Sequence, residues 1–152
     1  MNKQKIMKIV SLLMAICCLL CWIYLTSEDN KIKNECKALY EKEHLTAGDI
    51  KTESSFKSCV SVGDAKSGEI EVKYKKLYGI EHIGEFKLEK DDGIEVKFIE
   101  GNRLKILILD EVGNERFYRE VSELYFEPGE SGRYDVYVVG NEFTGKLVFK
   151  VY

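Results

Sequence analysis

The stretch Gly68-Glu-Ile-Glu-Val-Lys-Tyr74 alternates strictly between charged and apolar residues, and this alternation decides the fold class. Successive side chains of a β-strand point to opposite faces, so the pattern predicts a strand with one buried and one solvated face. A second stretch, Gly93-Ile-Glu-Val-Lys-Phe98, repeats the pattern directly after the turn residues Asp91 and Asp92. We therefore expect a β-domain built from short antiparallel strands.

Further strand-like segments, separated by glycine-containing turns, continue to the C-terminus. Residues 104–109 are apolar on both faces except for Lys105, which is typical of a central strand. Residues 134–138 alternate again, and a turn at residues 140–145 is expected to close the last pair of strands. Only one helical pattern accompanies these strands, so no βαβ order supports a parallel sheet. The sequence therefore predicts an all-β fold, an antiparallel β-sandwich of seven or eight strands, in residues 51–152.

An apolar segment runs from Ile9 to Leu25 near the N-terminus and follows three lysines. Its 17 residues, as an α-helix, rise about 26 Å, which crosses a hydrocarbon core if Lys8 extends to the headgroups. The lysines on one side and the acidic Glu28 and Asp29 on the other orient the N-terminus toward the cytoplasm. We therefore expect a single-pass cell-membrane protein with an extracytoplasmic C-terminal domain, its signal-anchor or transmembrane segment being residues 1–26.

The same apolar segment could instead be a cleaved secretory signal or carry a lipid. A cleavage site needs small residues, which residues 24–27 supply only poorly, so an uncleaved anchor is favoured. The cysteines Cys17, Cys18 and Cys21 are not preceded by the small residue of a bacterial lipobox. We expect them to be apolar filling of the helix rather than acylation sites.

A short amphipathic helix is expected after the span, in residues 27–50. Ser27 can cap its start, and its end is expected near residues 46–48. Its apolar residues fall on one helix face: Ile32, Cys36, Leu39 and Tyr40. This narrow stripe allows either packing against the β-domain, which we favour, or a free juxtamembrane stalk.

Cys36 and Cys59 are the two cysteines outside the apolar segment. In an oxidising compartment they are a candidate disulfide pair, closing a loop of about 24 residues worth ~3 kcal/mol in the chain-entropy model. Spacing alone does not establish the pairing, and two free thiols are the alternative.

Length and charge limit the class of protein. The 152 residues, 45% of them hydrophobic, suit a single domain of ordinary size after the targeting segment. Three of the 23 basic residues precede the apolar segment, which leaves 20 basic against 26 acidic residues in the rest of the chain. An acidic surface of this kind disfavours nucleic acid as a partner.

Three stretches in roughly the last ninety residues share turn glycines and core alternation. They are Tyr74-Lys-Lys-Leu-Tyr-Gly79, Arg103-Leu-Lys-Ile-Leu-Ile-Leu-Asp110, and Gly132-Arg-Tyr-Asp-Val-Tyr-Val-Val-Gly140 with Phe143-Thr-Gly145. In these stretches the chain resembles the small lipoprotein-type or membrane-anchored β-sandwich proteins of Firmicutes, although the lipobox of the lipoprotein members is missing. The resemblance implies a fold and a location, and it transfers no activity to particular residues.

Catalytic and metal-binding motifs are absent from the sequence. His44 and His82 belong to no metal or triad motif, and the two outer cysteines are too isolated for a zinc site. Asp91, Asp92 and Glu95 carry oxygens suited to calcium, but Asp-Asp-Gly is better explained as a hairpin tip. We therefore expect no enzyme, no cofactor and no metal. An enzyme, ranked third, would need a concave pocket where a histidine or cysteine meets a carboxylate.

Aromatic residues supply the remaining functional signal. Four tyrosines have neighbours on the predicted inner face, so they are candidate ligand-facing aromatics on one sheet: Tyr78, Tyr118, Tyr125 and Tyr137. Aromatic cross-strand pairs also stabilise sheets without any ligand. We predict a non-enzymatic binding module that contacts another envelope component, such as a protein, through an exposed face or edge strand. The alternative is a cell-wall glycan-binding module, which requires a flat, exposed row of tyrosines.

Overall fold

The computed structural model describes five ranges of the chain: residues 3–51, 56–57, 60–62, 69–101 and 104–152. The chain forms two compact units, Met1–Ile32 and Lys33–Tyr152.

A single helix, α1, extends over Lys3–Glu41, and a short helix, α2, follows at Ala47–Lys51. The helix start predicted at Ser27 is therefore wrong, as is the end predicted near residues 46–48. No glycine or proline occurs before Gly48, so no helix breaker separates the apolar segment from residues 27–41, and one helix runs through both. The Thr26 hydroxyl donates to the carbonyl oxygen of Trp22, one turn earlier, at 2.9 Å. This bond satisfies the hydroxyl inside the helix, so Thr26 does not end it.

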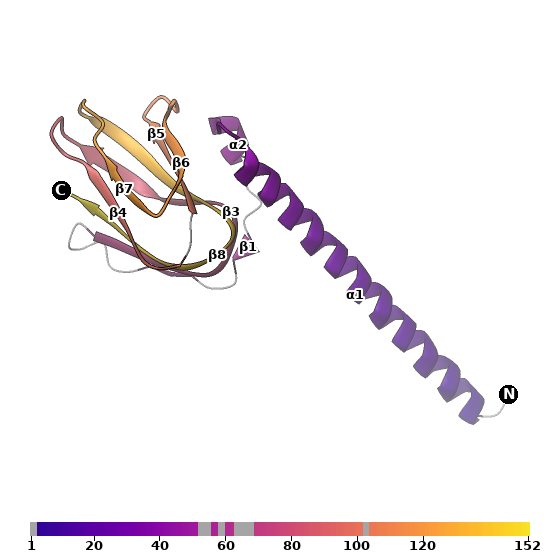
Figure 1. Cartoon of the computed structure of the whole chain (residues 1–152). Helices are drawn as coiled ribbons and strands as arrows, with labels where there is room; N and C mark the ends of the chain where they lie inside the picture. Colours follow the sequence, from indigo (N-terminus) through magenta and orange to yellow (C-terminus); the bar gives the residue numbers. More distant parts are fainter. Residues whose placement is uncertain (1–2, 52–55, 58–59, 63–68, 102–103) are drawn as a thin grey trace. The chain divides into compact units, whose positions relative to one another are not determined.

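Six strands of four or more residues build the β-domain (Figure 1). Two shorter strands, β1 (Phe56–Lys57) and β2 (Val60–Val62), pair with the first of the six. All the described pairings are antiparallel, as the alternation predicts. The six strands are β3 (Glu69–Leu88), β4 (Ile94–Gly101), β5 (Leu104–Asp110), β6 (Glu115–Val121), β7 (Glu123–Phe126) and β8 (Gly132–Val151).

The two longest strands, β3 and β8, have 20 residues each and pair with each other along their length. At its C-terminal half β8 also pairs with β4, and β7 follows β4. At its N-terminal half β8 pairs with β5, and β6 follows β5. The sheet thus has a first half (residues 69–78 of β3, 141–151 of β8, β4 and β7) and a second half (79–88 of β3, 132–140 of β8, β5 and β6), which fold onto each other in a barrel-like arrangement.

Glycines mark the crease between the two halves. Gly101 has a φ of 112°, a conformation that favours glycine, and a Cβ at Gly145 would lie 2.9 Å from the Gly101 Cα. The turn predicted at residues 140–145 is therefore wrong, because β8 continues through these residues and bends there. Segments expected as two strands are halves of one strand, so among the described residues six strands have four or more residues, rather than the seven or eight predicted.

The space between the two halves holds the main hydrophobic core. Val72, Leu104, Ile106, Val136 and Val138 are buried in one cluster, and Ile70 packs against it. These residues come from both halves of the sheet, so the predicted common interior is confirmed. The expected central position of residues 104–109 is also confirmed, since β5 is paired on both sides.

A second hydrophobic cluster covers the outer face of the second half. Leu107 and Leu109 of β5 point to this face, where Leu39 and Tyr40 of the end of α1 pack against the cluster. The favoured packing of this helical segment against the β-domain is therefore confirmed. Residues 104–109 are apolar on both faces because Leu104, Ile106 and Ile108 point into the main core, while Leu107 and Leu109 point into this second cluster. The buried members are Leu45, Ile50, Ile80, Leu107, Leu109, Tyr118 and Val139.

Candidate functional site

Helix α1 contains the one described segment that is long and apolar enough to cross a membrane. The segment, Val10–Glu41, reaches a mean hydropathy of 2.2 over an 18-residue window, and none of that window is buried. The three cysteines predicted as apolar filling, Cys17, Cys18 and Cys21, are exposed on this helix. Such a helix has the properties that a membrane anchor requires, and the predicted orientation stays a prediction.

On the outer face of the second half, Lys105 lies between the end of α1 and the sheet. Its Nζ is 5.1 Å from the ring centroid of Tyr40 and 4.7 Å from that of Tyr118, and it donates to the carbonyl oxygen of Lys42 at 2.8 Å. The Tyr118 hydroxyl donates to the carbonyl oxygen of Leu39 at 3.3 Å, and burial raises the pKa of this phenol. Tyr118 therefore holds the helix end rather than facing a ligand.

Two other predicted tyrosines are also engaged within the domain. Tyr78 is buried, and the Nζ of Lys33 lies 5.5 Å from its ring centroid. Tyr137 is half-buried, with its ring 4.8 Å from that of His82. The His82 Nε2 in turn lies 2.8 Å from the Asp135 Oδ1. Tyr137 and Tyr118 lie in one cross-strand row through Leu107, but Leu39 and Tyr40 of α1 pack against this face.

The other histidine, His44, lies in the connection between α1 and α2. Its Nδ1 is 3.0 Å from the Glu115 Oε1, and this hydrogen bond raises the pKa of the imidazole. The second oxygen of Glu115 accepts the backbone N–H of Leu45 at 3.0 Å. Glu115 thus ties the connection to strand β6, which gives His44 a structural role.

The fourth predicted tyrosine, Tyr125 of β7, is 57% exposed, and the C-terminal Tyr152, 46% exposed, lies beside it. Their ring centroids are 6.4 Å apart with planes at 70°. The Tyr125 hydroxyl donates to Glu123 at 3.1 Å, and hydrogen bonding with the carboxylates of Glu95 and Glu123 raises the pKa of the phenol to about 12. The Tyr152 hydroxyl donates to Glu127 at 3.4 Å. We call these five residues the aromatic corner.

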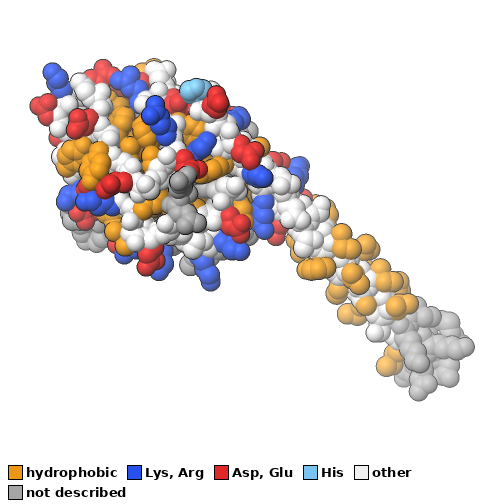
Figure 2. Space-filling model, in the orientation of Figure 1, with side chains coloured by type: hydrophobic (Ala, Val, Ile, Leu, Met, Phe, Trp, Pro, Cys, Tyr) orange, Lys and Arg blue, Asp and Glu red, His pale blue; other side chains and the backbone are white. Residues whose placement is uncertain are grey.

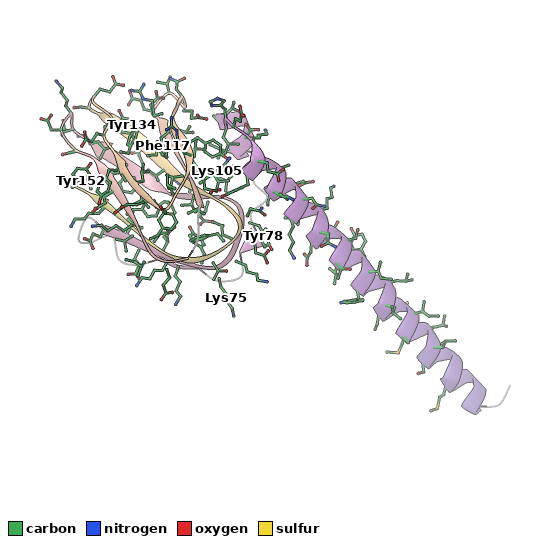
Figure 3. All side chains as sticks on the ribbon, viewed as in Figure 1. Lys75, Tyr78, Lys105, Phe117, Tyr134 and Tyr152 are labelled. Atoms are coloured by element: carbon green, nitrogen blue, oxygen red, sulfur yellow. The ribbon has the colours of Figure 1, made fainter. Side chains whose placement is uncertain are left out.

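Gly93 makes room for the aromatic corner. Its N–H donates to the Tyr152 carbonyl at 3.0 Å and its carbonyl accepts the Tyr152 N–H at 3.1 Å. A Cβ at Gly93 would lie 2.6 Å from the tip of the Tyr152 ring, so a larger residue there would displace the ring from its present position. Figure 3 labels Tyr152 at this end of the domain, and Figure 2 shows orange side chains gathered there among red and blue ones.

The rest of the first half's outer face carries cross-strand ion pairs. The Nζ of Lys146 lies 2.8 Å from Glu71, and that of Lys150 lies 3.2 Å from Glu69. These pairs are exposed, so each contributes little to stability. They confirm the solvated face that the alternation of residues 68–74 predicts.

Two of the acidic residues considered as calcium ligands, Asp92 and Glu95, form a turn hydrogen bond and an ion pair instead. The Asp92 Oδ2 accepts the Glu89 N–H at 2.8 Å, as a turn residue does, and Glu95 pairs with Lys97 at 2.8 Å. Among the residues described here, no group of three histidine, cysteine, aspartate or glutamate side chains has the arrangement of a metal site.

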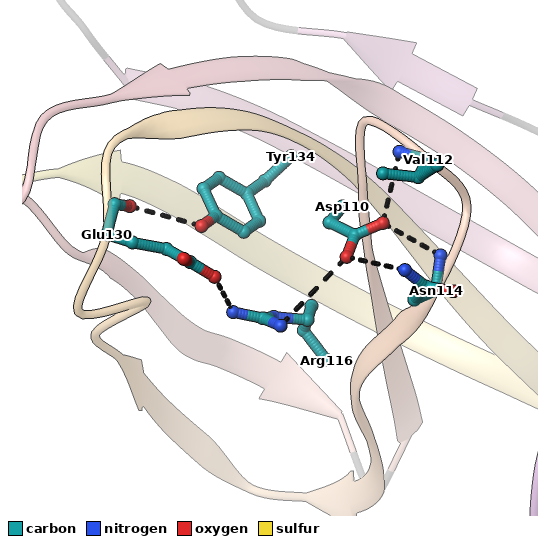
Figure 4. A network of polar contacts seen from close by, with 6 residues as sticks. All are labelled: Asp110, Val112, Asn114, Arg116, Glu130 and Tyr134. Carbon is teal, nitrogen blue, oxygen red and sulfur yellow. Dashed lines mark hydrogen bonds and ion pairs between the residues drawn. The ribbon is translucent and has the colours of Figure 1, made fainter.

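A polar network joins the β5–β6 turn to the loop before β8 (Figure 4). The Asp110 Oδ1 accepts the N–H groups of Val112 and Asn114 at 3.1 and 2.8 Å, and these bonds lower the pKa of the carboxyl. Arg116 forms ion pairs with Asp110 and Glu130. The Tyr134 hydroxyl also donates to the Glu130 carbonyl at 3.1 Å, so the network clamps two loops together.

Beside this network lies an open cavity of about 200 Å³. Its lining contains neither histidine nor cysteine, and the absence of enzymatic activity stays a prediction. The lining residues are Asp110, Glu111, Val112, Glu130, Ser131, Gly132, Arg133 and Tyr134.

The candidate disulfide involves one described residue. Cys36 is completely buried, but Cys59 lies outside the described residues. The disulfide stays a prediction.

Sequence reasoning selected Tyr125 but missed Tyr152 and Lys105. In the sequence, Gly93 indicates only a turn. That its missing side chain leaves room for the Tyr152 ring becomes visible only when the two residues are brought together in the structure. In the sequence, Lys105 stands out as the single charged residue in an apolar strand. A charged side chain at a buried face is stable only when other groups pair with it, so this position was a signal for a specific contact.

Comparisons with known proteins place the chain in no family. No family model and no curated protein matches it. A Drosophila melanogaster CENP-C cupin domain is 6% identical, with 82% of this chain and 98% of that chain covered and a TM-score of 0.39. A structure of accessory secretory proteins 1, 2 and 3 from Streptococcus pneumoniae is 13% identical, with 73% of this chain and 95% of that chain covered and a TM-score of 0.34.

A family 11 carbohydrate-binding module from Clostridium thermocellum, in complex with a mixed-linked tetrasaccharide, is 11% identical. The match covers 64% of this chain and 84% of the carbohydrate-binding module, with a TM-score of 0.29. Likenesses at this level carry no argument about function.

Proposed function

We propose that this chain is a membrane-anchored, extracytoplasmic interaction module without enzymatic activity, which binds another envelope protein. The aromatic corner is the observation that carries the proposal. Helix α1 supplies the uncleaved anchor, with the N-terminus in the cytoplasm and the β-sandwich outside. The resemblance to anchored Firmicutes proteins points to the same location.

The choice of the aromatic corner follows from what occupies the other sheet surfaces. The outer face of the second half lies under the end of α1, and most of the first half's outer face carries ion pairs. Two tyrosine rings remain exposed beside one another at one end of the first half. Tyrosine is enriched in protein interfaces because it offers a large apolar surface and a hydrogen-bonding hydroxyl.

The glycan-binding alternative is less well supported. It requires a flat, exposed row of tyrosines, whereas Tyr78 and Tyr118 are buried within the domain. The exposed pair, Tyr125 and Tyr152, has ring planes at 70°, which offers no continuous flat platform to successive sugar rings.

Site-specific photo-crosslinking in intact cells tests the proposal. A photoreactive amino acid replaces Tyr152 in the full chain, and a matched chain carries it at Lys75, an exposed residue of β3 on the same half of the sheet. We expect one protein adduct from position 152 that is absent from position 75. Adducts with lipid alone, or equal adducts from both positions, would contradict the proposed function.

A further inference from the structure

The aromatic corner is assembled from three strands and the turn before β4. Tyr125 of β7 is the direct cross-strand neighbour of Glu95 of β4, and Glu123 lies two residues earlier on the same face of β7. Tyr152 continues β8 and is joined to Gly93 by two backbone hydrogen bonds. Glu95, Glu123 and Tyr125 are therefore held by strand pairing and Tyr152 by its two backbone bonds to Gly93, whereas Glu127 lies in the loop directly after β7.

The two rings form a wedge rather than a platform. Their planes meet at 70° with the centroids 6.4 Å apart. The face of an aromatic ring is negative and its edge positive, so a ring face attracts a cation. Rings packed edge to face in this way offer no flat surface to a sugar, whereas an exposed ring face suits a compact cationic group.

The carboxylates add negative charge beside the rings. Glu123 and Glu127 accept the tyrosine hydroxyls, and within the described part of the chain neither forms an ion pair with a basic side chain. Lys97 also feels the charge of Glu123, but it is bound to Glu95 at 2.8 Å. Lys150 lies opposite Glu95 in the sheet and helps to lower the pKa of that carboxyl, but its ammonium group is paired with Glu69 of β3. The corner therefore retains negative charge that a partner can complement.

We propose that the aromatic corner binds a lysine ammonium or arginine guanidinium group presented by a basic segment of an exported protein. This inference rests on the proposed function and names the chemistry of the partner. The cation would lie against the rings of Tyr125 and Tyr152 while Glu123 and Glu127 balance its charge. A rigid carboxylate and ring arrangement reduces the cost of ordering the site on binding.

A peptide titration tests the inference on the full chain in a polyoxyethylene detergent, which contains neither sugar nor ammonium groups. The probe is a fluorescent lysine-rich peptide, and its lysine-acetylated form is the control ligand. Fluorescence anisotropy should show saturable binding of the first peptide only, weakened by added salt because charges attract. Equal binding of the acetylated peptide would overturn the inference.

Matched variants locate the binding. Tyr125→Leu and Glu123→Gln should each weaken binding by about threefold or more, whereas Tyr125→Phe should stay within about twofold because it keeps the ring. Ile99→Ala, at an exposed apolar residue of the same half of the sheet, should leave affinity unchanged. Unchanged melting temperatures show that each variant is folded.

The outcomes separate this inference from the proposed function. If Tyr125→Leu and Ile99→Ala bind the peptide equally, the corner is not a cation site. If the crosslink at position 152 persists while no basic peptide binds, the cation inference fails and the interaction module remains. Competition by a neutral cell-wall oligosaccharide would overturn the inference in favour of the glycan-binding alternative.

Discussion

The crease of the sheet depends on Gly145, and replacing it with alanine should destabilise the β-domain. A Cβ there would clash with the carbonyl oxygen of Glu100 and lie 2.9 Å from the Gly101 Cα. Both are backbone atoms of the paired strand, so a rotamer change cannot relieve the clash. Overpacking of this kind costs about 1–3 kcal/mol, and we expect about 2 kcal/mol for Gly145→Ala.

A control variant lies on the same strand. A Cβ at Gly132 would meet its nearest atom, in the Tyr134 ring, at 3.5 Å, which is ordinary contact. Near-UV circular dichroism of the tyrosines, recorded on the full chain in detergent, reports unfolding of the β-domain. We expect Gly145→Ala to lower the melting temperature by on the order of 5–10 °C and Gly132→Ala to change it little. Equal melting temperatures would refute the claim that the backbones of β4 and β8 approach too closely at Gly145 to admit a side chain.

Three further predictions concern side chains of the β-domain and the helix end. Lys105→Met should loosen the end of α1 by about 1–2 kcal/mol, because it removes the hydrogen bond to the Lys42 carbonyl and the cation between two rings. Faster amide hydrogen exchange in residues 36–41 would report this, and unchanged exchange would contradict it. Asp49 has its pKa lowered to about 2, first by the hydrogen bond from Lys42, so its stabilising effect is present above its ordinary value of 3.8 and is lost as pH falls toward 2. Thermal unfolding between pH 5 and 2 should therefore be less pH-dependent in Asp49→Asn, and parallel curves would argue against this role. The buried hydroxyl of Tyr74 has no hydrogen-bond partner in the described part of the chain, so Tyr74→Phe should stabilise the domain by about 1 kcal/mol in denaturant unfolding. A loss of stability would mean that the hydroxyl is satisfied.

Local patterns were enough to predict the strands and their buried faces. Ile106 and Val136 share one interior because every second side chain of a strand points to the same face. The apolar face of each strand can therefore be found from the sequence alone. The strand count was wrong because a glycine in a turn and a glycine in a crease look alike along the chain. What distinguishes Gly145 is Glu100, a residue far away in sequence that the sheet brings opposite to it.

The tyrosines show the same division at the candidate site. Tyr118 and Tyr125 both follow an apolar residue in a strand, yet one is covered by the end of α1 and the other is exposed. Tyr152 gains its neighbours only when the chain end pairs with Gly93. No local pattern carries this information, because each contact joins segments that are distant in sequence.

The amino-acid sequence by itself determined the apolar helix, the antiparallel strands and the faces that avoid water, because hydrophobic periodicity is a property of neighbouring residues. The tertiary structure alone decided which of the apolar or aromatic faces stays open. That outcome depends on which distant element lies over each face: the end of α1 covers one side of the second half, whereas the rings of Tyr125 and Tyr152 stay exposed among the described residues.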